Sequence, residues 1–187
     1  MVFWKHGYDA TSVAQLTDAM GIGVPSMYAA FGDKRALFDE ALLHYMKTYG
    51  AFMARLFDEP QFEKQSVRAA ITQLLREAAA MFTSSDHPRG CMLITAATNC
   101  APESAAIAKR LRELRVSTVR ALEGHIAGAI AHGELPADVD ARALALYVSA
   151  VLQGLSAQAR DGATRADLEA IVDTAMRAWP RPRRTTR

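Results

Sequence analysis

Apolar side chains recur with the 3.6-residue spacing of an α-helix through almost the whole chain, and this feature narrows the fold most. The clearest case is the segment 67–82, where one face is apolar turn after turn. No segment has the alternating β-branched pattern of a half-buried strand. The sequence therefore predicts an all-α protein.

Two short helices joined by a tight turn are predicted between residues 12 and 31. Ser12 and Gln15 form a capping-box pattern that begins the first helix, Gly21 ends it, and Pro25 stands near the start of the second. The face of the second helix that we expect to pack on the first carries Val24, Met27 and Phe31. This is the pattern of a helix-turn-helix, whose second helix enters the major groove of DNA.

A third helix follows at once, because Gly32 interrupts the second helix and Asp33 can cap the next. We expect this helix to run from Lys34 to about Leu56 and to connect two domains. The predicted division is a helix-turn-helix domain at 1–50, a larger helical domain at 51–179, and a disordered basic tail at 180–187.

Composition places the chain among folded proteins, since half of its 187 residues are hydrophobic and 22% are charged. No stretch is long and apolar enough to span a membrane, and the first residues do not form a secretory signal. With only two cysteines, the expected compartment is the reducing cytoplasm. The net charge is +2. Residues 1–50 hold four Lys or Arg against five acids, a net charge of −1, which counts against a DNA-binding segment.

The first fifty residues resemble the TetR/AcrR family of transcriptional regulators. The motifs that carry this resemblance are Gly7-Tyr8, Thr11-Ser12, Met20-Gly21, Tyr28-Ala29-Ala30-Phe31, Lys34 and Leu37-Phe38. The family begins with a longer first helix, so we expect most of that helix to be missing here, with Val2, Phe3 and Trp4 as its last turn.

The resemblance also implies roles at the DNA. Phosphate contacts are expected from Thr11 or Ser12, Tyr28 and Lys34. Base reading would fall to Gly23, Val24, Pro25, Ser26 and Ala29. These five residues offer one hydroxyl and apolar contact with thymine methyl groups, so DNA shape would supply much of the specificity.

In the resembled family the larger domain holds a small-molecule effector. The implied pocket residues are Phe52, Leu56, Met81, Phe82, Met92, Thr95, Thr98 and Asn99, with Met53 beside them; ordinary core packing is the alternative for each. Cys91 or Cys100 could be a thiol sensor if exposed beside a cation, whereas a buried thiol would be inert. The spacing of His87 and the cysteines fits no zinc site, and we expect no metal or cofactor.

The last two predicted helices are apolar over more than one face, and the surplus must be buried. The resemblance implies a two-fold homodimer interface made by Tyr147, Val148, Val151, Leu155, Leu168, Ile171, Val172 and Ala175. Such a two-fold would set the two recognition helices roughly 34 Å apart, about one turn of DNA.

The sequence thus predicts a ligand-responsive transcriptional repressor that binds a palindromic operator as a homodimer and is released by a small-molecule effector. The alternative is a helical ligand-binding dimer that has lost DNA binding. No nucleophile elbow, metal pair or phosphate-binding loop occurs, so an enzyme is not expected.

Overall fold

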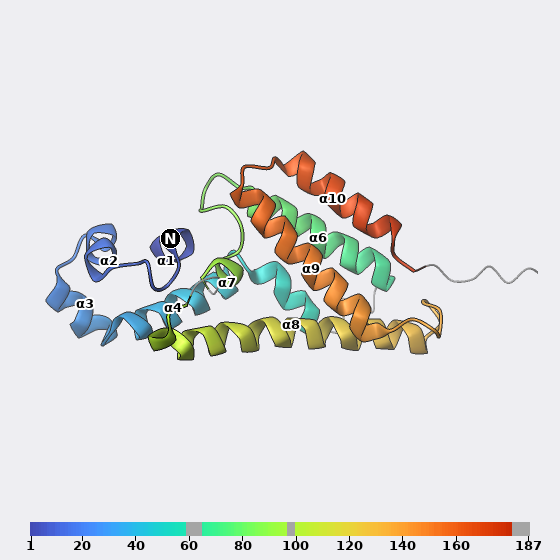
Figure 1. The fold of residues 1–187 in the computed structure, drawn as a ribbon, viewed down its shortest axis with the longest axis horizontal. Helices are drawn as coiled ribbons and strands as arrows, with labels where there is room; N and C mark the ends of the chain where they lie inside the picture. Colours follow the sequence, from blue (N-terminus) through green and yellow to red (C-terminus); the bar gives the residue numbers. More distant parts are fainter. Residues whose placement is uncertain (59–64, 97–99, 181–187) are drawn as a thin grey trace, which may run out of the picture.

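A computed structural model describes residues 1–58, 65–96 and 100–180 of the chain. Every regular element in these ranges is helical, which confirms the all-α prediction. The molecule is elongated, with α1 to α4 gathered at one end and the larger helical bundle at the other (Figure 1). No helix in the described ranges is long and apolar enough to cross a membrane.

The end formed by the first four helices contains α1 (Val2–His6), α2 (Val13–Met20), α3 (Val24–Phe31) and α4 (Lys34–Lys47). Ser12 begins α2 with a complete capping box: its hydroxyl accepts from the Gln15 N–H, and the Gln15 side chain accepts from the Ser12 N–H at 2.8 Å. Gly21 ends α2 at φ +66°, a left-handed conformation that glycine adopts without strain. Asp33 accepts from the Ala36 N–H at 2.7 Å and begins α4.

The helix after α3 is shorter than predicted. It ends at Lys47, and the 3₁₀ helix η1 (Ala51–Phe57) follows. The Thr48 hydroxyl donates to the His44 carbonyl, and the Gly50 N–H donates to the Tyr45 carbonyl. These local hydrogen bonds satisfy carbonyl groups in the last turn of α4. A Cβ atom at Gly50 would lie 3.3 Å from Tyr45 and Met46, so the chain turns tightly against α4.

The larger bundle is built by α6 (Val67–Phe82), α8 (Ala105–Ala131), α9 (Ala141–Arg160) and α10 (Arg165–Arg177), with the short elements α7 (Met92–Thr95) and η2 (Pro102–Ser104) before α8. Helix α7 is short, and residues 97–99 after it lie outside the described ranges. The predicted tail beyond Pro180 also lies outside them.

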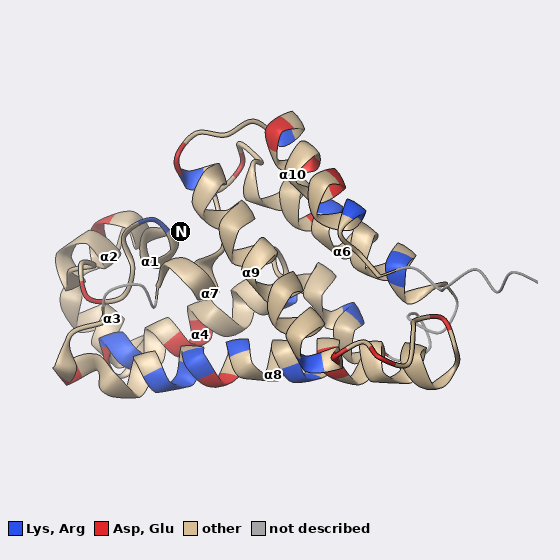
Figure 2. Cartoon of the chain, turned by 45° about the vertical axis from the view of Figure 1, so that its right-hand side comes forward, with Lys and Arg blue, Asp and Glu red and all other residues tan. Residues whose placement is uncertain are grey.

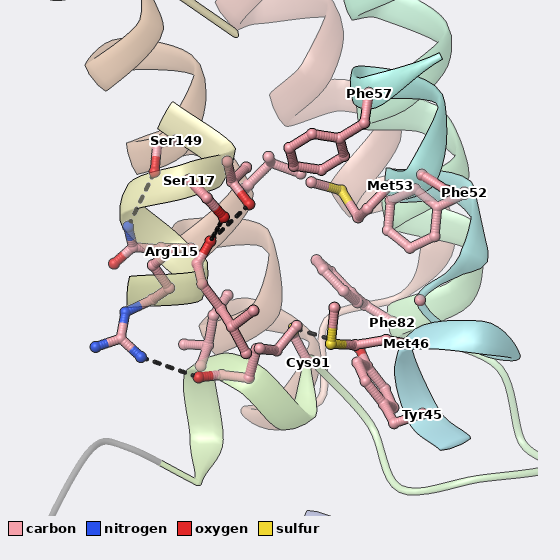
Figure 3. A pocket seen from close by; sticks show the side chains of 18 residues that line it. Tyr45, Met46, Phe52, Met53, Phe57, Phe82, Cys91, Arg115, Ser117 and Ser149 are labelled. Carbon is pink, nitrogen blue, oxygen red and sulfur yellow. Dashed lines mark hydrogen bonds between the residues drawn. The ribbon is translucent and has the colours of Figure 1, made fainter. Parts of the chain in front are cut away.

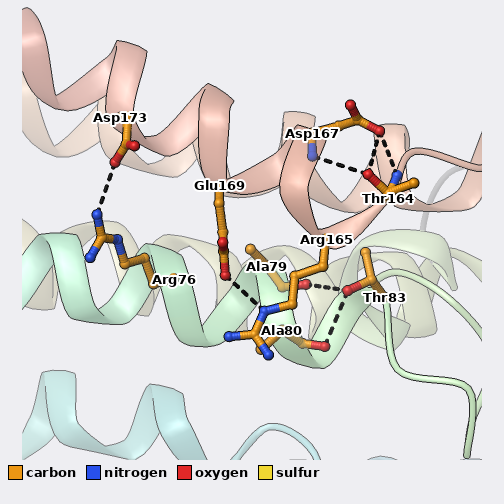
Figure 4. Close-up of polar contacts among 9 residues, drawn as sticks. All are labelled: Arg76, Ala79, Ala80, Thr83, Thr164, Arg165, Asp167, Glu169 and Asp173. Atoms are coloured by element: carbon orange, nitrogen blue, oxygen red, sulfur yellow. Dashed lines mark hydrogen bonds and ion pairs between the residues drawn. The ribbon is translucent and has the colours of Figure 1, made fainter.

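Helix α10 lies along α6, and Figure 4 shows one ion pair between them and further polar contacts within each helix. Arg76 on α6 pairs with Asp173 on α10 at 3.0 Å. Thr164 and Asp167 cap the start of α10 reciprocally. The apolar side of α10, including Leu168 and Val172, is buried in the bundle.

One continuous apolar core joins the two ends of the molecule, running from Phe3 and Trp4 to Trp179. Val2 to Trp4 do form a helical turn, as expected, and Phe3 and Trp4 are buried. Polar links cross between the ends, and they include a hydrogen bond from the Ser104 hydroxyl to the Asp9 carboxylate. The Trp4 indole N–H donates to the Gly90 carbonyl at 3.2 Å, and the Asp9 carboxylate accepts from the Ala101 N–H at 2.8 Å.

Candidate nucleic-acid interface and ligand cavity

Helices α2 and α3 pack against each other through a few residues that fix which side of α3 faces outward. Leu16 and Thr17 on α2 are buried, and Met27 at the middle of α3 is fully buried. Because α3 has only eight residues, this single buried side chain sets the rotation of the helix. The prediction of two separate short helices joined by a glycine turn is confirmed.

The opposite side of α3 is open to solvent. Val24 is 43% exposed and Tyr28 is 46% exposed, and Gly23, Pro25, Ser26 and Ala29 are exposed as well. The expectation that Val24 packs inward is wrong. Val24 is the first residue of the helix, directly after the turn, whereas the contact with α2 is filled by Met27 and partly by Phe31.

The two candidate hydroxyls at the start of α2 differ in accessibility. Thr11 is 1% exposed, and its hydroxyl donates to the Gly7 carbonyl at 2.6 Å. Ser12 is exposed and accepts from the Gln15 N–H, which leaves its own proton free to donate. Ser12 therefore replaces Thr11 as the residue that can reach a phosphate, since a buried hydroxyl whose proton is already engaged cannot.

Lys34 begins α4 with its ammonium 4.5 Å from the centre of the Tyr8 ring, a cation–π arrangement. Partial burial lowers the pKa of Lys34, and the nearby Asp9 carboxylate opposes that change. The Tyr8 ring thus holds the cation in place beside the start of α4, as a positioned phosphate contact requires.

An apolar cavity of about 220 Å³ lies in the larger domain, where α4 and η1 face α8 and α9 (Figure 3). Aromatic and methionine side chains form one wall, from Tyr45, Met46, Phe52, Met53, Phe57 and Phe82. The other wall includes Leu114, Arg115, Ser117, Thr118, Ser149, Leu152 and Gln153. Cys91, Leu93 and Ile94 close the cavity between them.

Only part of the predicted pocket set lines this cavity. Phe52 and Phe82 do, together with Met53. The cavity is not lined by Leu56, Met92 or Thr95, which are buried elsewhere in the core. Met81 is half-buried and does not line it either. Thr98 and Asn99 lie outside the described residues. The lining residues that sequence reasoning missed come from α4, η1, α7 with Cys91 before it, α8 and α9. The adjacent small polar residues Ser117 and Thr118, between Val116 and Val119 on α8, were the available signal.

Most polar groups of the cavity wall are already bonded within the protein. Ser117 and Thr118 both donate to the Leu114 carbonyl, so their oxygens remain as acceptors. Gln153 donates to the Ser149 hydroxyl oxygen, which leaves the Ser149 proton available. The Arg115 guanidinium donates to the Leu93 carbonyl at the edge of the cavity. A molecule held here would make mainly apolar contacts with a few hydrogen bonds.

Cys91 lies at the base of the cavity and is buried, and the Tyr45 hydroxyl donates to its sulfur at 3.3 Å. Burial raises the pKa of the Cys91 thiol, and burial also raises that of Cys100. Both side chains are therefore thiols at neutral pH. This favours the expectation of inert thiols over that of a thiol sensor. The described residues contain no cluster of His, Cys, Asp and Glu that could hold a metal ion.

The expected dimer face divides into core and surface residues. Val148, Leu155, Leu168, Val172 and Ala175 are buried within this chain, so they hold α9 and α10 against the bundle and cannot contribute contact area to a partner. This corrects the prediction for these five residues, because the apolar stripe of each helix serves the chain's own core first. The apolar side chains left at the surface are Leu146, Tyr147 and Ile171, with Val151 half-buried.

Comparisons with known proteins agree with this architecture over nearly the whole chain. Residues 1–41 match the model of the tetR family of bacterial regulatory proteins, and residues 68–178 match a tetracyclin repressor-like C-terminal domain. The HTH-type transcriptional repressor ComR of Escherichia coli is 37% identical over 96% of this chain and 84% of its own length. The repressor BdcR of the same organism is 32% identical over 87% of this chain and 75% of its own length.

A solved structure of the TetR family regulator CifR, a cysteine mutant complexed with a 26-bp double-stranded operator, matches with a TM-score of 0.87 and 43% identity. The match covers 96% of this chain and 92% of that one. The resemblance first drawn from residues 7–38 is thereby confirmed, and both ends of the molecule match the same family. The chain belongs to the TetR family of helix-turn-helix transcriptional regulators.

Proposed function

We propose that this protein is a transcriptional repressor that binds operator DNA as a homodimer and is released when a small molecule occupies the cavity. The observation that carries the proposal is the outward face of α3: it projects at the far end of the molecule from the bundle, with Ser26 and Tyr28 exposed (Figure 1). The operator complex of the similar CifR chain supports it. Such a repressor acts in the cytoplasm, where the DNA is.

In this proposal phosphate contacts come from Ser12, Tyr28 and Lys34, which surround the reading face of α3. Tyr28 is exposed and can place its hydroxyl at the backbone, and Lys34 is held in position by Tyr8. Base edges are contacted by Gly23, Val24, Pro25, Ser26 and Ala29. Contacts to the backbone set register, and contacts to base edges set sequence.

The cavity is placed to couple effector binding to DNA binding. Tyr45 and Met46 in its wall belong to α4, whose first residue is the proposed phosphate contact Lys34. An effector that needs more room than about 220 Å³ displaces α4, and α4 carries the helix-turn-helix with it. The ligand then favours a form in which the two reading helices no longer match the operator spacing. We infer an effector that is small and largely apolar.

The dimer would be formed by α9 and α10 through Leu146, Tyr147, Val151 and Ile171. Tyr147 already donates its hydroxyl to the Ala175 carbonyl, so its ring is fixed across both helices of the proposed interface. Fixed aromatic side chains contribute contact area with little loss of side-chain entropy. A two-fold axis here would give each operator two equivalent half-sites.

The test is a gel-shift titration of purified protein against the DNA upstream of its own coding region, repeated over a series of salt concentrations. We expect a band that resists an excess of unrelated competitor DNA and weakens as salt rises. A protein that remains dimeric and binds small apolar molecules, but gives no specific band on this DNA or on fragments of the whole genome, would be the ligand-binding dimer without DNA binding.

A further inference from the structure

The reading helix of this protein lacks the side chains that usually identify bases. Residues 21–32, from the glycine before the turn to the glycine after α3, contain no Lys, Arg, Asp, Glu, Asn, Gln or His. Figure 2 shows the charged residues on other elements. Paired hydrogen bonds to guanine require Arg or Lys, and those to adenine require Asn or Gln. Neither kind of contact can come from this segment.

The segment instead presents apolar side chains to solvent. Ile22 in the turn is 37% exposed, Val24 is 43% exposed, and Pro25 and Ala29 are exposed beside them. The buried Met27 fixes this face outward, so these side chains cannot turn into the core. Tyr28, 46% exposed, stands on the same helix as a proposed phosphate contact.

Helix α2 brings no basic side chain to the turn, and its exposed Asp18 carboxylate can accept a hydrogen bond but not donate one. Its one amide side chain, Gln15, stands in the first turn, and the Gln15 carbonyl oxygen is engaged in the capping box with the Ser12 N–H. The cation nearest along the chain, Lys34, is held over the Tyr8 ring. Apart from the single hydroxyl of Ser26, base discrimination by α3 therefore rests on what apolar groups can recognise.

In the major groove one base carries an apolar group at its edge: thymine, through its C5-methyl. We propose that α3 recognises thymine methyl groups by apolar contact, with Val24 as the principal reader, and that each operator half-site carries thymine at the matching position. This inference rests on the proposed function and names the chemical feature of the DNA that is read. Burial of one methyl group contributes about fourfold in affinity, and the two half-sites of a dimer together about fifteenfold.

The experiment begins with selection of duplexes from a randomised library by the full-length chain. Each thymine of the selected duplex is then replaced by uracil, which removes the methyl group and keeps every base-pairing and hydrogen-bonding group. We expect one thymine in each half-site at which the replacement weakens binding about fourfold, and about fifteenfold when both are replaced.

Two variants assign this effect to a residue. Val24→Thr keeps the shape of the side chain but exchanges a methyl for a hydroxyl, and we expect it to reduce the thymine-to-uracil affinity ratio towards one. Val116→Thr on α8 is the matched control: Val116 is 41% exposed, and we expect the full ratio to remain.

The outcomes separate this inference from the proposed function. Failure to enrich any duplex contradicts the proposed function itself. Enriched duplexes that bind equally well with uracil at every position overturn the inference and indicate recognition of DNA shape. A Val24→Thr variant that keeps the full ratio overturns the assignment to Val24.

Discussion

The indole N–H of Trp4 on α1 donates to the backbone carbonyl of Gly90, 86 positions further along the chain. The same indole ring stacks on His87, with ring centres 4.5 Å apart, and meets Tyr45 edge-on. The residue after Gly90 is Cys91, which lines the cavity and whose N–H donates to Ser156 on α9. One loop thus contacts the DNA-binding end, the cavity and the proposed dimer helix.

Trp4→Phe should weaken this junction. The substitution keeps an aromatic ring but leaves the buried Gly90 carbonyl without its donor, and we expect a loss of about 1–2 kcal/mol in the free energy of unfolding. Urea denaturation measures it. The control is Trp179→Phe, since the buried Trp179 indole N–H has no partner among the described residues. An equal loss in both variants would mean that ring volume, and not the hydrogen bond, stabilises the junction.

Lys34→Ala should reduce the dependence of operator affinity on salt. Each phosphate neutralised by a cation contributes about 0.9 to the slope of log K against log salt, so loss of two lysines in a dimer should lower the slope by about 2. Lys47→Ala, at the opposite end of α4, should leave the slope unchanged. A slope that does not change in Lys34→Ala would remove Lys34 from the phosphate contacts.

Ser117→Leu should fill the cavity from the side of α8. Leucine is a good helix former, and its side chain would occupy space that a small apolar molecule needs. With indole as the probe, we expect the ligand-induced rise in Tm of the parent protein to disappear in this variant. Val116→Leu adds the same kind of side chain at the exposed neighbouring position, and it should keep the full rise. If indole raises the Tm of Ser117→Leu as much as that of the parent protein, the indole-binding site lies elsewhere.

Ile171→Glu should dissociate the proposed dimer. It puts a charge among the exposed apolar residues of α9 and α10 that we propose to form the interface, where desolvation of an unpaired carboxylate is costly. Sedimentation velocity should then report monomers at concentrations where the parent is dimeric. Leu43→Glu, at an exposed leucine on α4, should remain dimeric. If Ile171→Glu sediments like the parent, the interface lies on another face.

The sequence predicted most reliably what depends on neighbouring residues. The Ser12 and Gln15 pair identified the start of α2, and the glycines at 21 and 32 identified the ends of α2 and α3. These features are local hydrogen bonds and backbone conformations, so the residues that specify them stand within a few positions of each other.

What the sequence did not predict depends on how helices are placed in space. The apolar pattern continues past Lys47, yet α4 ends there because Gly50 packs closely against Tyr45. The cavity wall depends on the angle at which α8 and α9 face η1, so helical periodicity alone could not place Ser117 and Ser149 in that wall. Periodicity identified apolar residues on α9 and α10 but could not separate the chain's core, as at Val148, from the surface, as at Ile171.

The central claim is that the exposed face of α3 recognises a DNA sequence. The most direct measurement is fluorescence anisotropy at about 150 mM salt, comparing a duplex selected by the protein with a scrambled duplex of the same composition. The account predicts binding to the selected duplex at least about 1,000-fold tighter. It also predicts that Tyr28→Ala weakens binding to that duplex without changing the fold. Equal affinity for the two duplexes, or unchanged binding by Tyr28→Ala, would contradict it.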